Sequence, residues 1–418
     1  MTNEVRYFVG IDWASQQHRM CLLDASGRYI AERDIAHGGA ALSEACDWLL
    51  EKTGAQPEEI GVAIETPRGP VVEIFVERGF QVHSINPKQL DRFRDRFTVA
   101  GAKDDSRDAH VLGDALRTDP RAFRLLSLEE PLLIELREWS RMLEDLQQER
   151  TRLTNRMRDQ LWRYYPQALE LTDDLGADWF LDVWEKAPTP AKASRAKERT
   201  IASILKTHRI RRLDAAEVLR ILGQKALWVA PGTAEAACAH ISTVAARLQL
   251  INKQIKEAHR QLDELCGKFE ASAESSPGQM CEQRDVAILR SLPGIGRINL
   301  ATLLAEGWDL LRRRDYHALR ILSGSAPVTR QSGKKRLVTR RYACNNRLQN
   351  AMYHWARVAM QHDPTSRHRY SELRKRGHSH ARALRGLADR LLYVLCTLLE
   401  RQTLFDPGYK CSPAGAPP

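Results

Sequence analysis

YFVGID, residues 7–12, is a short apolar run rich in β-forming side chains, and it ends on an acid. Other apolar runs with the character of short strands follow at residues 20–23, 29–32, 61–65 and 81–85. Turn-forming residues 24–27 (DASG) separate the second run from the third, and helical spacing appears over about residues 40–52. Three successive short strands followed by alternating helices and strands predict an α/β fold, a mixed sheet with helices packed on it.

From Pro131 onward the sequence has the pattern of long helices. Apolar residues at heptad steps recur at Leu143, Leu146, Leu153 and Met157, and Arg150 interrupts this seam. A second run keeps steps of three and four through Leu248, Ile251, Ile255, Ala258, Leu262 and Leu265. This spacing predicts coiled-coil helices. An antiparallel pair inside one chain would satisfy the seam as well as a homo-oligomer would.

Changes in composition divide the chain. We expect an α/β domain over residues 1–130, coiled-coil helices over 131–270, a mainly α-helical C-terminal domain over 279–408 and a tail over 409–418. A basic, Trp-containing stretch over about 166–232 is predicted to be an insertion between the helical runs, and the polar segment 271–278 (ASAESSPG) a linker.

The charge balance favours a polyanionic partner. Lys and Arg number 64 against 53 Asp and Glu, a formal net charge of +11. Such an excess favours nucleic acid through phosphate contacts, although a general basic bias would give the same numbers. The 8 cysteines include no C-x-x-C pair, which argues against a zinc knuckle or redox motif. The chain opens with polar residues and has no apolar run that could span a bilayer, so we expect a cytoplasmic protein without membrane contact.

Acidic residues follow two of the predicted strands. Asp12 ends the first, and Glu65 ends the apolar run 61–65 (GVAIE) just before a proline. A carboxylate at the end of a buried strand needs a partner, and a metal ion can supply one. The alternatives are an Asp that caps a turn and a Glu in an exposed loop.

A third acidic element, residues 103–109 (KDDSRDA), opens a predicted helix. Asp105 and Asp108 are three residues apart and therefore share one face of that helix. Acids at a helix start also serve as ordinary capping groups. The whole set, two strand-end acids and a D-x-x-D helix, is the layout needed to hold two divalent ions around a scissile phosphate. Oxygen ligands select Mg²⁺ or Mn²⁺ over zinc.

The N-terminal part resembles the RuvC-like, RNase H-fold domain of the DEDD insertion-sequence transposases, the IS110 family, which includes the Piv-type DNA invertases. The resemblance assigns the catalytic and metal-binding acids to Asp12, Glu65, Asp105 and Asp108. Asp104 stands where the family usually has Thr. Its spacing to Asp108 does not fit the motif, so we favour Asp105 as the ligand.

The C-terminal domain extends this resemblance. Residues 291–296 (SLPGIG) resemble a helix-hairpin-helix turn, in which Gly294 and Gly296 would let backbone amides approach a phosphate. Residues 326–335 (APVTRQSGKK), followed by 340–345 (RRYACN), resemble the Ser-Gly block of the family's transposase domain. The resemblance makes Ser332 the nucleophile. A serine that binds phosphate or caps a turn is the alternative, and Ser323 and Ser325 are nearby competitors that precede the block.

Taken together, the resemblance implies a transposase that cuts and rejoins DNA at element ends and target. It also implies a noncoding bridge RNA as guide and a homo-oligomer, a dimer or tetramer. A covalent link would conserve phosphodiester energy, so no ATP is needed, and none of the expected P-loop glycines appears. Two alternatives remain: a RuvC-like nuclease that hydrolyses DNA without using Ser332, and a non-catalytic nucleic-acid-binding oligomer.

Candidate nucleic-acid contacts lie in basic or glycine-rich clusters, although a solvated helix face explains any single cluster equally well. They are Arg92, Arg94, Arg96, Arg107, Arg156, Gly294, Gly296, Arg330, Gly333, Lys334, Lys335, Arg336, Arg340 and Arg341.

Overall fold

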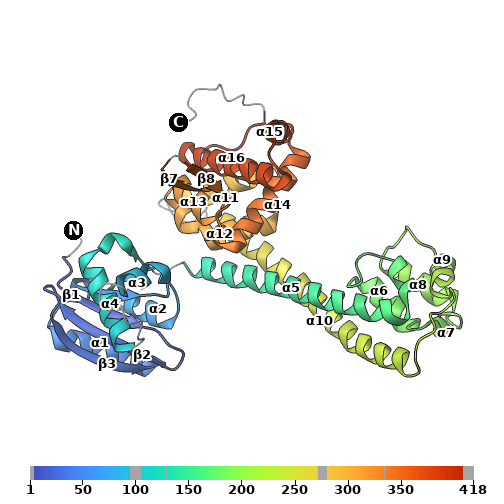
Figure 1. Cartoon of the computed structure of the whole chain (residues 1–418), viewed down its shortest axis with the longest axis horizontal. Helices are drawn as coiled ribbons and strands as arrows, with labels where there is room; N and C mark the ends of the chain where they lie inside the picture. Colours follow the sequence, from blue (N-terminus) through green and yellow to red (C-terminus); the bar gives the residue numbers. More distant parts are fainter. Residues whose placement is uncertain (1–3, 95–104, 128–129, 272–279, 334, 408–418) are drawn as a thin grey trace. The chain divides into compact units, whose positions relative to one another are not determined.

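The computed structural model describes residues 4–94, 105–127, 130–271, 280–333 and 335–407. The chain divides into two compact units, residues 1–130 and residues 131–418, which we call the first and the second unit. Figure 1 labels the helices and strands of both units. In the described part of the chain, no helix combines the length and the apolar character that crossing a membrane requires.

The first unit is built on a mixed sheet with the strand order β3-β2-β1-β4-β5-β6. Its strands are β1 (Tyr7–Asp12), β2 (Gln17–Asp24), β3 (Tyr29–Ala36), β4 (Ile60–Ile64), β5 (Gln81–Ser84) and β6 (Arg124–Leu125). Strands β1, β2 and β3 form an antiparallel meander, whereas β4 runs parallel to β1 and β5 runs parallel to β4. The predicted α/β fold is confirmed, and the arrangement is consistent with an RNase H-like domain.

Helices cover both faces of this sheet. They are α1 (Gly39–Thr53), α2 (Pro70–Glu77), α3 (Pro87–Arg94) and α4 (Asp105–Thr118), with short 3₁₀ turns η1 (Pro57–Glu59) and η2 (Pro120–Ala122). Alternate residues of a strand point to opposite faces. Val9 and Ile11 therefore pack with α1 and α2 in one core. Ala63 of β4 packs with α3 and α4 in a second core on the other face.

Helix α4 lies unusually close to β1 because glycines line the contact. A Cβ atom added to Gly10 would lie 1.8 Å from the carbonyl oxygen of Ala109, and one added to Gly113 would lie 3.1 Å from the Gly10 nitrogen. Leu116, further along α4, approaches Gly61, which pairs with Phe8 near the start of β1. Helix α4 therefore runs antiparallel to β1, and its N-terminal turn lies toward the edge where β1 and β4 end.

The second unit is organised by two long helices, α5 (Pro131–Tyr164) and α10 (Thr233–Ala271). Leu143 shares a core with Leu262, whereas Leu153 shares another with Leu248, so the two helices run antiparallel. Figure 1 shows them side by side, with helices α6 to α9 at one end and α11 to α16 at the other. The two apolar seams predicted from sequence thus pack against each other within one chain.

Each end of this helix pair has a hydrophobic core of its own. The insertion core contains η3 (Pro166–Glu170), α6 (Asp178–Lys186), α7 (Pro190–Ala193), α8 (Glu198–Thr207) and α9 (Ala215–Leu222). The C-terminal core is formed mainly by α11 (Met280–Ser291), α12 (Arg297–Arg312), α13 (Tyr316–Leu322), α14 (Asn346–His362) and α16 (His380–Arg401). Helix α15 (Pro364–Lys375) and the hairpin β7 (Val328–Ser332) and β8 (Lys335–Thr339) complete the unit.

Arg150, which interrupts the apolar seam of α5, forms a polar layer between the long helices. Its Nε donates to Oδ1 of Asn252 on α10 (2.9 Å), and its terminal nitrogen donates to the carboxylate of Asp174 (2.8 Å). Asn252 in turn donates to the carbonyl of Gly176 (2.8 Å) and to Asp178 (2.6 Å). The layer therefore ties the start of the insertion to the helix pair.

Candidate functional site

Asp12 and Glu65 lie side by side at one edge of the sheet. Strands β1 and β4 are parallel, and their register ends with Ile11 opposite Ile64, so the two acids are the next residues on neighbouring strands. Neighbouring strands lie about 4.8 Å apart. Asp12 follows Gly10 by two residues and Glu65 follows Ala63 by two, so the alternation assigns both acids to the sheet face that α4 covers.

Helix α4 brings the third acidic element to the same edge. Asp108 lies next to Ala109, the residue in closest contact with Gly10, and is only 9% exposed. Asp105 is the first residue of α4, although its side chain lies outside the described structure, as does all of Asp104. The fold thus gathers Asp12, Glu65, Asp108 and the start of α4 at the carboxyl ends of β1 and β4.

The acids suit a hard divalent cation. All four predicted ligands are carboxylates, the donors that Mg²⁺ and Mn²⁺ prefer. Among the described side chains, no group of three or more His, Cys, Asp or Glu residues is close enough to hold a metal ion. Asp105 lies outside that search, and Asp12, Glu65 and Asp108 each interact with other groups in the chain. The carboxylate chemistry of the donor set fits the metal, but Asp12, Glu65 and Asp108 do not lie close enough together in the described structure to hold a metal ion by themselves.

Glu32 links α4 to the sheet beside these acids. Its Oε2 accepts a hydrogen bond from the Ser106 hydroxyl (2.7 Å), and its other oxygen accepts one from Arg19. Arg19 is the β2 residue opposite Asp12 and also donates to Asp34 (2.7 Å). Glu32 thus holds the first turn of α4 in place. No local pattern predicts this role of Glu32, because the contact joins residues 74 positions apart.

His18 fixes the loop that follows Asp12. Its side chain is fully buried, and its Nδ1 accepts the backbone N–H of Ala14 (3.3 Å). Because that nitrogen accepts, Nε2 carries the proton and donates to Nδ1 of His37 (3.0 Å). Burial, and secondly the nearby His37, lower the pKa of His18. Neutral His18 therefore positions the loop, a role that the sequence pattern does not reveal.

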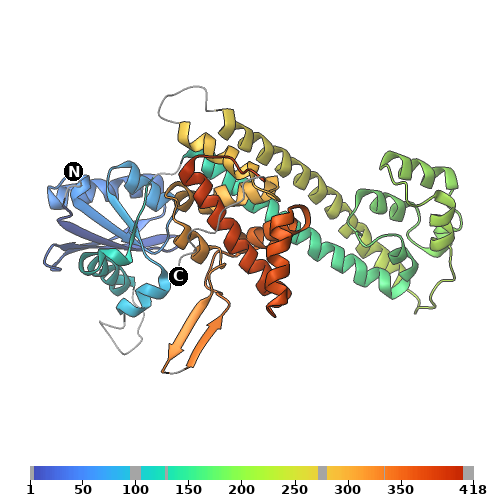
Figure 2. The same cartoon turned by 90° about the horizontal axis from the view of Figure 1, so that it is seen from above.

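Ser332 lies at the tip of the β7–β8 hairpin. It ends β7, pairs with Lys335 of β8 and is exposed. Gly333 follows with φ +55°, a conformation that suits a tight turn. Figure 2 shows this hairpin, in orange, extending away from the helices of the second unit. Within the part of the chain that the structure describes, the Ser332 hydroxyl makes no hydrogen bond, and the residue is exposed and therefore accessible to a substrate.

The two competing serines have a different environment. Ser323 and Ser325 are both buried, and their hydroxyl oxygens lie 3.1 Å apart. A buried hydroxyl cannot attack a phosphorus atom in line with the leaving oxygen without rearrangement. Exposure therefore favours Ser332 over either competitor as the residue that attacks a strand.

The turn at residues 292–296 joins α11 to α12, but its glycines have different surroundings. Gly294 has φ +78°, and an added Cβ would lie 2.5 Å from the Ala359 nitrogen of α14. Gly294 is therefore required for packing, whatever else it contacts. Gly296 has nothing within 4 Å of an added Cβ. A phosphate contact remains a prediction for both.

The predicted basic contacts are spread over both units. Arg92, Arg107, Arg156, Arg330 and Arg340 are exposed, whereas Arg341 is half-buried. Arg96 and Lys334 lie outside the described residues, and so do the side chains of Arg94, Lys335 and Arg336. Nucleic-acid contact through these residues remains a prediction.

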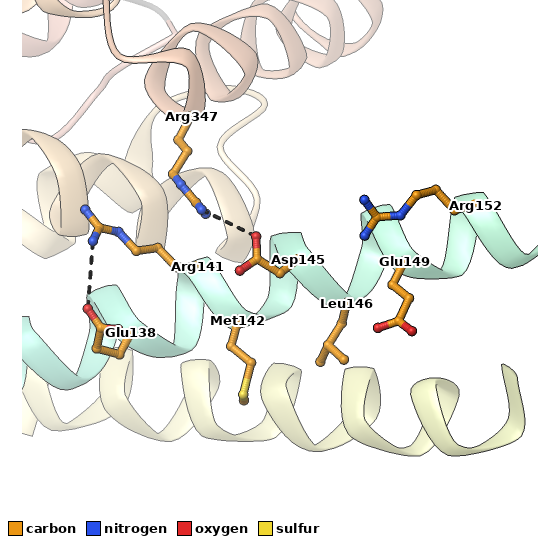
Figure 3. A pocket seen from close by; sticks show the side chains of 8 residues that line it. All are labelled: Glu138, Arg141, Met142, Asp145, Leu146, Glu149, Arg152 and Arg347. Atoms are coloured by element: carbon orange, nitrogen blue, oxygen red, sulfur yellow. Dashed lines mark ion pairs between the residues drawn. The ribbon is translucent and has the colours of Figure 1, made fainter. Parts of the chain in front are cut away.

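A hollow on the second unit lies along α5 and has a volume of about 400 Å³. Figure 3 shows Arg347 pointing toward Asp145 and Arg141 pointing toward Glu138. Arg141 also pairs with Glu306 (3.0 Å), so the arginines here have acidic partners. This hollow has no excess of positive charge. The ion pairs Arg141–Glu306 and Arg347–Asp145 at this hollow hold α5 against the C-terminal core.

Comparisons with known proteins match the two regions that carry the predicted residues. Residues 9–166, which include the four acids, match a family described as "Transposase". Residues 286–371, which include Ser332, match the "Transposase IS116/IS110/IS902 family".

Individual relatives extend the similarity to almost the whole chain. A "Mini-circle putative transposase for IS117" from Streptomyces coelicolor is 33% identical over 408 residues, 96% of this chain and 95% of its own length. A "Putative transposase y4uE" from Sinorhizobium fredii is 60% identical over 227 residues, which span 54% of this chain and 63% of that protein. An "Insertion element IS900 uncharacterized 42 kDa protein" from Mycobacterium paratuberculosis is 26% identical over 413 residues.

Proposed function

Because this chain belongs to the IS116/IS110/IS902 family of transposases, we propose that it cuts and rejoins DNA strands during transposition of an insertion sequence. The strongest support for this proposal is the placement of three acids at one edge of the sheet. The ends of β1 and β4 and the first turns of α4 bring Asp12, Glu65 and the buried Asp108 to one edge of the sheet. The placement of acids from three separate elements at one edge supports the proposal of a shared site.

We assign Asp12, Glu65, Asp105 and Asp108 to the binding of Mg²⁺ or Mn²⁺. Bound divalent ions would neutralise the charge that develops on the phosphate and on the leaving oxygen. The chain's own contribution is to fix the carboxylates in advance. Gly10 allows α4 to approach β1, Glu32 holds the first turn of α4, and His18 holds the loop after Asp12. Such preorganisation lowers the cost of reaching the transition state.

We assign the nucleophile to Ser332. In this step its Oγ attacks the phosphorus, a P–Oγ bond forms, and the bond to one strand oxygen breaks. The serine proton passes to the departing strand oxygen, which leaves as a hydroxyl, and a different strand hydroxyl later attacks the phosphorus and returns the proton to Ser332. Bond energy is conserved in the phosphoserine link, so rejoining needs no ATP. A serine hydroxyl is a weak nucleophile at neutral pH, so its activation by a metal ion or a base is required.

We further propose a noncoding bridge RNA as the guide and a dimer or tetramer as the working form. The net charge of +11 and the exposed arginines are consistent with long nucleic-acid contacts. The oligomer is proposed from the resemblance alone, because the apolar seams of α5 and α10 already pack against each other within one chain. We also propose that α5 and α10 pack against each other as a coiled coil.

Replacement of Asp108 by Asn tests the acid site. We expect Asp108→Asn to reduce Mg²⁺-dependent cleavage of labelled element-end DNA, with RNA transcribed from the flanking region, by about a hundredfold or more. Asp119→Asn is the matched control, because Asp119 is exposed beyond the other end of α4 and its side chain makes no capping hydrogen bond. Full cleavage by Asp108→Asn would show that Asp108 is not needed for the reaction and would contradict the proposed acid site.

A further inference from the structure

A small cavity opens in the second unit near the base of the β7–β8 hairpin. It has a volume of about 250 Å³ and lies between the turn after α13, helix α14 and helix α16. Its lining includes Ser323, Ser325, Arg340, Gln349 and Arg385, and no carboxylate. The lining surface is more apolar than polar, but its only charged groups are the guanidinium groups of Arg340 and Arg385, which suit an anion.

The two arginines come from separate elements. Arg340 follows β8, donates a hydrogen bond to Oε1 of Gln349, and lies 5.3 Å from the centre of the Tyr342 ring. Arg385 is half-buried on α16 and forms no ion pair with any carboxylate in the described part of the chain. Burial, followed by the charges of Arg340 and Arg382, lowers the pKa of Arg385. Positive charge is therefore concentrated here without compensation.

The opposite wall supplies hydroxyl groups in a fixed position. Ser323 and Ser325 are buried, and Gly324 between them has φ +70°. A Cβ added to Gly324 would lie 2.5 Å from Nε2 of Gln349, so the turn is packed tightly against α14. Serine hydroxyls donate to phosphate oxygens, and two arginine forks bind phosphate with directional hydrogen bonds. These four side chains surround a space that a phosphate group fits chemically.

We propose that this cavity binds a backbone phosphate of a nucleic-acid strand through Arg340 and Arg385, with the Ser323 and Ser325 hydroxyls as further donors. This phosphate-binding proposal rests on the proposed function, which supplies the nucleic acid as partner. It assigns Ser323 and Ser325 a role in binding. Ser332 pairs with Lys335 at the start of β8, and Arg340 directly follows the end of β8. Lys335 and Arg340 are therefore about five residues, or about 16 Å, apart along the strand. That length equals the rise of about five stacked nucleotides. The cavity thus sets the position of a strand relative to Ser332.

Binding to short DNA and RNA strands, measured with the full chain, tests this proposal. All proteins carry Ser332→Ala and Mg²⁺ is omitted, so no chemistry contributes. We expect Arg385→Gln to weaken binding of one or both strands about tenfold, which corresponds to about 1.4 kcal/mol. The slope of log affinity against log salt should also fall by roughly one charge. The strand that is affected identifies the source of the phosphate.

Arg390→Gln is the matched control, since Arg390 lies on the same helix, is exposed and does not line the cavity. It makes the same change of charge and should leave affinity close to that of the parent. Ser325→Ala should weaken binding less than Arg385→Gln does, and thermal unfolding checks that each variant folds.

Equal affinities of Arg385→Gln and Arg390→Gln for both DNA and RNA would overturn the proposal, even if the cavity bound inorganic phosphate. That failure would differ from a failure of the proposed function. The binding experiment does not depend on whether Ser332 forms a covalent link.

Discussion

Gly10 is the residue on which the geometry of the acid site most depends. Any side chain there would place an atom 1.8 Å from the Ala109 carbonyl oxygen, so α4 would have to move away from β1. Asp108 would move with it. We expect Gly10→Ala to lower the free energy of unfolding by about 3 kcal/mol or more and to abolish cleavage. Chemical denaturation and the strand-cleavage assay measure the two effects.

Gly38→Ala is the control for this substitution. Gly38 has nothing within 4 Å of an added Cβ and has an extended backbone, with φ −170°. It should unfold and cleave like the parent. Parent-like behaviour of Gly10→Ala would show that close packing of α4 on β1 is not required.

His18 should make the stability of the protein depend on pH. Burial lowers its pKa in the folded state, whereas the unfolded chain protonates at the ordinary value of about 6.5. The unfolded state therefore binds more protons below that pH. The contribution of His18 is fully present above pH of about 6.5 and is lost as the pH falls toward its lowered pKa.

Replacement of His18 by Asn tests this dependence. Asn offers a carbonyl oxygen near the position of Nδ1 but does not titrate. Between pH 7.5 and 5.5, we expect the free energy of unfolding to fall less steeply for His18→Asn than for the parent. His317→Asn, at an exposed position, should retain the slope of the parent. An unchanged slope in His18→Asn would mean that His18 does not titrate in this range.

At the residue scale, the acids of the candidate site could be proposed because they form local sequence patterns, and their roles stay predictions. Asp12 and Glu65 each follow a short apolar run, and Asp108 lies in a D-x-x-D spacing. Their convergence still required the parallel register of β1 and β4, which no local pattern contains. Glu32 and His18 have no such pattern, because their partners are distant in sequence or are backbone groups.

At the scale of elements, the α5–α10 pair shows what a heptad pattern can and cannot predict. The spacing of Leu143, Leu153 and Met157 correctly predicted a buried seam. It could not identify the partner, because a second chain offers the same apolar surface as a second helix. Arg150 and Asn252 form the polar layer of this pair, and their matched positions favour one register.

Arg150→Ala should destabilise the second unit. It would remove the hydrogen bond to the buried Asn252 and the ion pair with Asp174, and we expect a loss of about 1–3 kcal/mol. Faster proteolysis within residues 166–232 should accompany this loss, since the layer anchors the start of the insertion. Arg152→Ala is the control, because Arg152 is exposed on the same helix and forms no ion pair in the described ranges. If the two variants were equally stable, the polar layer of Arg150 and Asn252 would have no structural role.

At the scale of the whole molecule, the sequence predicted the class of each region better than the packing between regions. Alternating strands and helices predicted the α/β sheet of the first unit, and the long periodic runs predicted α5 and α10. The insertion core escaped prediction because its helices are short, and they bury their apolar faces against distant segments of α5 and α10. The hairpin at Ser332 was not predicted from the sequence, for a different reason. Its strands are mostly polar and exposed, so they lack the apolar alternation of a buried strand.

The central claim is that Ser332 becomes covalently linked to DNA during strand exchange. The most direct measurement incubates the full chain with Mg²⁺, labelled element-end DNA and RNA from the flanking region, and separates protein–DNA adducts under denaturing conditions. Thr329→Ala serves as the control, since Thr329 is exposed on the same strand. We predict an adduct with the parent and with Thr329→Ala, and none with Ser332→Ala. Cleavage without an adduct, unchanged in Ser332→Ala, would contradict the account and make the protein a hydrolytic nuclease.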